Sequence, residues 1–280
     1  MATLNPPIRD WSGKRVWVVG ASAGIGKALA ESLTRAGAIV IATARRPDAL
    51  AALSPPPAHC VVADIAKEAS VKEALSEIES REGGLDVVFW VAGVYHPMTS
   101  QHLDLAAVRE TFEVNLLSAY SGLSLVLARW LARPPSEPSE PSESELPAGS
   151  RRAPPPRTRH WVWVSSVAGY RGLPKAAAYG ASKAALTYLA ETNYLELRSS
   201  GIAVSVVCPG FVETRLTAKN EFQMPAIITP EEAAAATLKG MARGEFEIHY
   251  PKRFTRIMRL LRILPYWLYF PLAARALPKE

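Results

Sequence analysis

The sequence is poor in the residues that bind metals or form disulfides. Its two cysteines, Cys60 and Cys208, lie far apart inside apolar runs, so we expect reduced thiols buried in the core. Its five histidines are scattered and show neither HExxH nor CxxC spacing, which argues against a metal site. The N-terminus has no charged-then-apolar leader that ends in small residues, so we expect no secretion signal.

Acidic residues are almost absent from one end of the chain. The formal net charge is +6, and residues 251–280 hold seven Lys or Arg against one acid, Glu280. The remainder is therefore neutral and offers no basic surface of the kind that binds nucleic acids. We expect no nucleic-acid partner, and we assign the basic character to the tail at 251–280.

Apolar content is high, at 49%, and strand-like segments alternate with helix-like segments. The strand-like runs are continuously apolar, which is typical of strands buried on both faces of a parallel sheet. The order predicts a single doubly wound α/β domain over residues 1–250, with helices on both faces of the sheet. We expect strands at 14–20, 38–44, 59–64, 85–93, 160–166 and 202–210, and main helices after the first strand and at 67–81, 105–131 and 177–200.

One segment, residues 133–160, interrupts this order. Eight prolines, acidic Ser-Glu-Pro repeats and several arginines give it no apolar surface to bury. We expect a disordered surface insertion between a helix and a strand. A partner-binding role is the alternative.

Three glycines, Gly20, Gly24 and Gly26, stand between the first strand and the first helix. A phosphate that approaches a helix N-terminus needs free backbone N–H groups and residues without a Cβ. A glycine turn alone is weak evidence, but its place after the first buried strand of an α/β chain indicates a dinucleotide cofactor.

Residues 161–186 bring together a hydroxyl, a phenol and an amine. Ser166 ends a strand-like run, and Tyr179 and Lys183 are spaced i, i+4, so on a helix they share one face. Reduction of a carbonyl needs a proton donor, and a cation beside a tyrosine stabilises its phenolate and lowers its pKa. Taken singly, such residues are more often part of a helix surface or a turn.

With these motifs the chain resembles the short-chain dehydrogenase/reductase family over residues 14–243. Asn115 in "VNLL" matches the family's helix asparagine, and "CPGFVETRL" is similar to its P-G-x-V-x-T segment. The resemblance implies a Rossmann-like fold in which Tyr179 is the catalytic acid/base and Lys183 its activator. It also implies that Ser166 donates to the substrate oxygen and that Asn115 anchors a water that relays protons.

The chain departs from the family at two positions. Val19 stands where a threonine is frequent, and Val91-Ala92-Gly93 replaces Asn-Ala-Gly. One polar contact that braces the cofactor loop in the family is therefore missing, although the backbone that faces the nucleotide can still form.

The end of the second strand indicates which cofactor is used. NAD-preferring enzymes keep an acid there for the ribose 2′-hydroxyl, whereas this chain has Ala44 followed by Arg45 and Arg46. An arginine binds a 2′-phosphate, so we predict NADP(H), with an ordinary basic turn as the alternative. By the resemblance, Asp64 accepts from the adenine amine and Thr214 holds the nicotinamide carboxamide; helix capping is the structural alternative for each. The predicted cofactor contacts are Gly20, Ser22, Gly24, Ile25, Gly26, Arg45, Arg46, Asp64, Ile65, Ala92, Gly93, Tyr179, Lys183, Pro209, Gly210, Val212 and Thr214.

The tail at 251–280 combines basic and apolar residues at helical spacing. Four arginines spread over one face of the expected helix, and the opposite face gathers six apolar residues, Phe254, Ile257, Met258, Leu260, Leu261 and Leu264. Twelve uncharged residues, 263–274, follow, and a bilayer span takes about 20. We expect residues 252–275 to lie on a membrane surface; a cover over the substrate cleft and a subunit interface are the alternatives.

The segment 211–228 is apolar and is similar to the family's substrate lid. We therefore predict an NADPH-dependent carbonyl reductase that acts on a hydrophobic ketone or aldehyde, such as a 3-keto lipid, in the cytoplasm at a membrane. The reverse oxidation of a secondary alcohol uses the same residues, and family members are often homo-oligomers. The rival hypothesis is a redox sensor or scaffold that binds NADP(H) without turnover.

Overall fold

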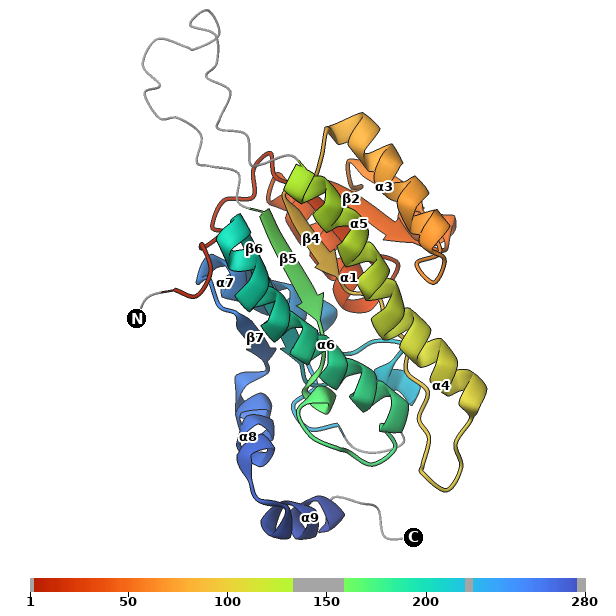
Figure 1. Ribbon diagram of the computed structural model, residues 1–280, viewed down its shortest axis with the longest axis vertical. Helices are drawn as coiled ribbons and strands as arrows, with labels where there is room; N and C mark the ends of the chain where they lie inside the picture. The colour runs from red at the N-terminus through yellow and green to blue at the C-terminus, as the bar shows by residue number, and fades with distance from the viewer. Residues whose placement is uncertain (1–2, 133–158, 220–223, 276–280) are drawn as a thin grey trace, which may run out of the picture.

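A sheet of seven parallel strands runs through the centre of the molecule (Figure 1). The computed structural model describes residues 3–132, 159–219 and 224–275. The strands lie in the order β3-β2-β1-β4-β5-β6-β7. Their bounds are β1 Arg15–Val19, β2 Ile39–Ala44, β3 His59–Val62, β4 Val87–Trp90, β5 Arg159–Val164, β6 Ile202–Pro209 and β7 Glu247–Tyr250.

Helices cover both faces of the sheet, so the predicted doubly wound α/β architecture is confirmed. One face packs against α1 Gly24–Arg35, α2 Pro47–Ala51 and α7 Pro230–Ala242. The other face packs against α3 Glu68–Glu82, α5 Ser118–Ala132 and α6 Ala177–Leu197, which stand in front of the sheet in Figure 1. Helix α4 Leu105–Phe112 precedes α5, and α8 Lys252–Ile263 and α9 Tyr266–Arg275 follow the last strand.

Tryptophans fill the core on the face covered by α5 and α6. Because side chains alternate along a strand, Trp17 of β1, Trp90 of β4 and Trp161 of β5 all point to this face. The rings of Trp90 and Trp161 stack with centroids 5.9 Å apart, and Trp17 meets Trp90 edge-on at 6.0 Å. Gly122 of α5 leaves room for this cluster, since a Cβ there would lie 2.2 Å from two ring carbons of Trp90.

The expected helix over 105–131 forms as a continuous helical segment with a change of hydrogen-bond spacing in its middle. A π-helical turn, Glu113–Leu117, separates α4 from α5. The whole segment, Leu105–Ala132, is long and apolar enough to cross a membrane by length and composition. Nearly half of its most apolar stretch is buried inside the protein, and α5 packs on the tryptophan cluster, so it belongs to the core.

Three expectations about the elements were wrong or lie beyond the described residues. Strand β7 was not expected, because its four residues include a glutamate and a histidine and lack the continuous apolar character of the other strands. Cys60 was expected in the core but is exposed, because β3 is an edge strand and alternate residues of it face outward. The expected insertion at 133–160 lies outside the described residues, except that β5 already begins at Arg159.

Candidate active site

The glycine turn between β1 and α1 is shaped for the close approach of another group. Gly20 has φ +96°, and a Cβ on it would lie 2.7 Å from the backbone nitrogen of Ala92. A Cβ on Gly26 would lie 2.2 Å from the carbonyl oxygen of Gly20, so neither position admits a side chain. The N-cap of α1 is Ala23, whose methyl group cannot accept from the first turn. The free N–H groups there suit an anion such as a pyrophosphate.

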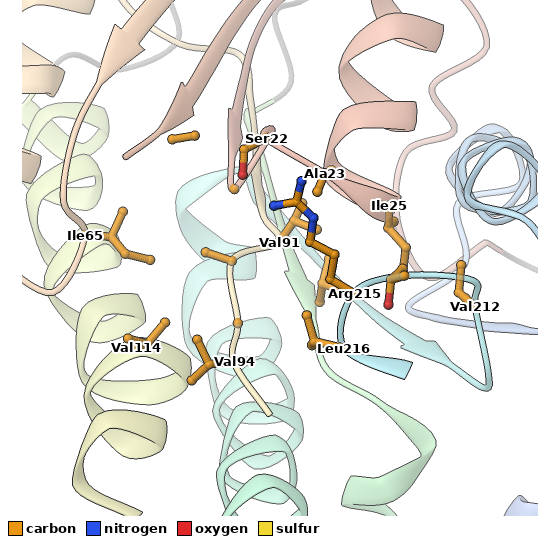
Figure 2. A pocket seen from close by; sticks show the side chains of 18 of the residues that line it. Ser22, Ala23, Ile25, Ile65, Val91, Val94, Val114, Val212, Arg215 and Leu216 are labelled. Carbon is orange, nitrogen blue, oxygen red and sulfur yellow. The ribbon is translucent and has the colours of Figure 1, made fainter. Parts of the chain in front are cut away.

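A cavity of about 370 Å³ opens at the carboxyl ends of the strands, a size typical of small-molecule sites (Figure 2). It lies next to β1 and β4, which are neighbours in the sheet although their following helices lie on opposite faces. Open α/β sheets bind ligands at such a crossover point. All seventeen predicted cofactor contacts line this cavity, together with the predicted catalytic residue Ser166.

The serine, tyrosine and lysine predicted to be catalytic converge on this cavity from two elements. Ser166 follows β5 directly; its Oγ accepts a hydrogen bond from the Ala168 backbone at 3.1 Å, and its hydroxyl also bonds to the phenol of Tyr179. Tyr179 and Lys183 stand one turn apart on α6, with Lys183 Nζ 5.7 Å from the centre of the Tyr179 ring. Tyr95 packs edge-on against Tyr179 at 5.1 Å between ring centroids.

Lys183 is a buried amine with a single hydrogen-bond acceptor in the described part of the chain. Lys183 is 3% exposed, and its Nζ donates to the Val164 carbonyl at 2.9 Å. Burial lowers the pKa of Lys183 to about 8. Its remaining N–H donors suit ligand hydroxyl groups in the cavity, such as those of a ribose.

The expected lowering of the Tyr179 pKa is not found. Burial raises the pKa of Tyr179 to about 12, and the hydrogen bond with Ser166 opposes this only in part. The reason is that Lys183 points its charge at the Val164 carbonyl and makes no hydrogen bond to the phenol, so the loss of solvation dominates. Tyr179 therefore holds its proton at neutral pH.

Asn115 is buried but does not line the cavity. Its Oδ1 accepts from the Val94 backbone at 2.7 Å, and its Nδ2 donates to the Val94 carbonyl and the Ser182 hydroxyl, both at 3.0 Å. The side chain therefore braces the loop after β4, next to the position where Val91 replaces the family's asparagine. The predicted proton relay at Asn115 stays a prediction.

The two residues for which helix capping was the alternative line the cavity. Asp64 Oδ1 accepts from the Ala66 backbone at 3.3 Å, but the N-cap of α3 is Lys67, so Asp64 does not cap that helix. Thr214 shares hydrogen bonds with Thr217 in the turn that follows. A Cβ on Gly24 would lie 2.8 Å from the Thr214 methyl group, which shows how closely the segment after β6 approaches the glycine turn.

Arg215 is a cavity residue that the sequence analysis missed. Figure 2 shows its side chain directed toward Ser22 and Ala23 of the glycine turn. Its place directly after Thr214 in the "VETRL" segment was the available signal. Val94, Val114, Leu216 and Thr217 also line the cavity and were not predicted.

Comparison with known proteins gives the same family for most of the chain. The short chain dehydrogenase model matches residues 14–136 and 160–224. An uncharacterized oxidoreductase of Myxococcus xanthus is 33% identical over 274 residues, which cover 96% of this chain and 99% of the relative. Farnesol dehydrogenase of Aedes aegypti is 29% identical over 81% of this chain and 89% of its own.

A solved structure shares the fold. A short chain dehydrogenase/reductase from Burkholderia phymatum, in complex with NAD, superposes with a TM-score of 0.75 at 21% identity. The match covers 90% of this chain and 94% of that chain.

Proposed function

Because the chain belongs to the short-chain dehydrogenase family, it is an oxidoreductase of carbonyl and alcohol groups, and we propose that it reduces a hydrophobic ketone or aldehyde with NADPH. The observation that carries the proposal is the single cavity that Ser166, Tyr179 and Lys183 share with the glycine turn. The proposed setting is the cytoplasmic surface of a membrane.

A nicotinamide cofactor held in this cavity would supply the hydride that adds to the carbonyl carbon. Tyr179 then transfers its phenolic proton to the carbonyl oxygen, and Ser166 donates a hydrogen bond to the same oxygen while charge develops on it. Lys183 stabilises the phenolate that remains. A pKa of about 12 keeps Tyr179 protonated at neutral pH, the state in which it can donate a proton to a carbonyl oxygen.

The cofactor preference rests on the arginines after β2. Arg45 and Arg46 are exposed at the cavity, and Ala44 offers no carboxylate to a ribose 2′-hydroxyl. Two guanidinium groups attract a 2′-phosphate, so NADPH is the proposed cofactor.

The substrate class rests on the apolar segment that follows β6. Val212 pairs with Ile228 across the ends of this segment, and Leu216 lines the cavity. The farnesol dehydrogenase relative is named for a long apolar alcohol, which agrees with a hydrophobic substrate. The rival hypothesis, a non-catalytic NADP(H) sensor or scaffold, requires no proton donor beside the cofactor, yet Tyr179 and Ser166 both face the cavity.

The test is NADPH oxidation by purified protein in detergent micelles, across ketones and aldehydes of increasing chain length. Tyr179→Phe removes the proton donor and should lower turnover at least about 100-fold while NADPH affinity is kept. Tyr188→Phe is the matched control, because this tyrosine lies on the same helix and is 74% exposed. NADPH binding without turnover on any substrate would favour the rival hypothesis, whereas turnover that survives Tyr179→Phe would refute the proposed role of Tyr179 as the proton donor.

A further inference from the structure

Helix α8 docks on the domain through one side only. Phe254, Met258 and Leu261, one turn apart along the helix, pack against the core, and Met258 is 6% exposed. The centroids of the Phe254 and Phe211 rings lie 5.3 Å apart. A Cβ on Gly210 would lie 2.8 Å from Cδ1 of Phe254, so the helix also packs closely on the backbone there. These three residues were expected on a membrane-facing side; that expectation was wrong, because the domain itself covers them.

An arginine in the segment between β5 and α6 fixes the two tail helices to the domain. Arg171, between Ser166 and Tyr179 in sequence, donates from Nη1 to the carbonyls of Leu261, Arg262 and Leu264 at 3.3, 2.8 and 2.7 Å. Its guanidinium carbon lies 4.6 Å from the Tyr266 ring centroid and 4.4 Å from that of Tyr269. The Tyr269 hydroxyl donates to the Gly172 carbonyl. These contacts hold α8 and α9 in a defined position on the domain.

The outward side of these helices exposes a concentration of large apolar residues. Ile263 and Trp267 each keep 76% of their surface exposed. The exposed set on α8 and α9 is Ile257, Leu260, Ile263, Tyr266, Trp267, Leu268, Phe270 and Leu272, which we call the tail platform. Exposed apolar clusters of this size mark a binding surface, because water disfavours them. Figure 1 shows α8 and α9 beyond the end of β7, at the lower edge of the molecule.

The charges beside the tail platform are all of one sign. Residues 252–275 contain six Lys or Arg and no Asp or Glu. Three of these cations form ion pairs with acids of the domain: Lys252 with Glu245, Arg259 with Glu247 and Arg262 with Glu191. In the described part of the chain, Arg253, Arg256 and Arg275 have no acid within ion-pair distance, and all three are exposed.

We propose that the tail platform lies flat on an anionic lipid bilayer. Its apolar and aromatic side chains enter the headgroup region, where tryptophan and tyrosine are favoured, and Arg253 and Arg256 face lipid phosphates. A second copy of the chain fits this surface less well, because a two-fold interface would bring the same uncompensated arginines together. No described residue of α8 or α9 lines the cavity, so the platform is not a cover for it. This inference deepens the proposed membrane setting and does not depend on the proposed catalytic activity.

The test is sedimentation of the full chain with vesicles of phosphatidylcholine alone and of phosphatidylcholine with phosphatidylserine. Ile263→Asp should weaken binding to the mixed vesicles at least about tenfold. Leu195→Asp is the matched control, since this leucine has the same 76% exposure but lies on α6, and it should change nothing.

A second pair of variants tests the charge. Arg256→Gln should weaken binding to the mixed vesicles about fivefold. Arg198→Gln is the matched control, because Arg198 is an exposed arginine at the end of α6, and it should leave vesicle binding unchanged. Equal binding to both vesicle types, or equal losses with the controls, would overturn the proposal. So would a dimer in analytical ultracentrifugation that Ile263→Asp dissociates while no vesicle binding is found.

Discussion

Cofactor discrimination provides the sharpest test of the cavity. Arg45 and Arg46 are exposed and line the cavity directly after the last residue of β2, so under the proposed function we expect both guanidinium groups to bind the 2′-phosphate of the adenosine ribose. A hydrogen bond to a charged partner in an exposed site contributes about a tenfold change in affinity. The double change Arg45→Ala with Arg46→Ala should therefore weaken NADPH binding about 100-fold and leave NADH binding unchanged.

The assay is titration calorimetry or cofactor fluorescence with both cofactors at two salt concentrations. Arg215→Ala is the informative control, because this side chain points to the glycine turn, where both cofactors carry the same phosphates (Figure 2). Arg215→Ala should lower the affinity for NADPH and the affinity for NADH by the same factor. Added salt should reduce NADPH affinity more in the wild type than in the double variant. If the double variant weakens both cofactors equally, or neither, the 2′-phosphate is not held by these arginines.

Three further predictions follow from burial. Reduction should keep a constant rate from about pH 6 to 7 and should slow above about pH 8, where more than half of the Lys183 side chains have lost their charge. Alcohol oxidation should rise about tenfold per pH unit from about pH 6 to 7, because it needs the phenolate of Tyr179; a reduction rate that rises with pH would contradict this. Burial lowers the pKa of His160 to about 3, so on acidification the unfolded state takes up a proton at this histidine before the folded state does. Between pH 7.5 and 5 the free energy of unfolding, measured with urea, should therefore fall by about 2 kcal/mol more in the wild type than in His160→Gln. An equal acid dependence of the two proteins would refute that assignment. Gly122→Ala should cost about 1–3 kcal/mol through its clash with Trp90, while Gly172→Ala, with nothing within 4 Å of its Cβ, should be close to neutral in the same unfolding assay.

Six of the seven strands and much of the cavity lining could be predicted because their signals are local. The runs that became β1, β2, β4 and β6 are continuously apolar, as burial on both faces of a parallel sheet requires. Most of the predicted cofactor contacts follow strand ends, and in a parallel sheet these ends meet at one edge; Tyr179 and Lys183 come to that edge from α6. The short strand β7 carries too weak a signal of this kind, and Arg215 stands in a segment whose path depends on contacts made elsewhere.

The orientation of the tail could not be read from its helical pattern. Periodicity predicted one apolar side on α8, but the packed side and the exposed side are both apolar, with Phe254 and Met258 on the first and Ile257 and Leu260 on the second. The contact with Phe211 and the hydrogen bonds from Arg171 decide which side of α8 packs against the domain, and the helical pattern predicts neither of them.

The sequence by itself determined the family, the order of the first six strands and the helices between them, and most of the residues that gather at the carboxyl edge of the sheet, because residue type and spacing fix these directly. Only the tertiary structure decided the protonation of Tyr179 and the orientation of the tail. Burial sets the first: the removal of water around Tyr179 raises its pKa more than the hydrogen bond with Ser166 lowers it, and Lys183, which the i, i+4 spacing placed beside the phenol, donates to the Val164 carbonyl instead. Contacts between residues far apart in the chain set the second, and no local pattern records which distant surface a helix will meet.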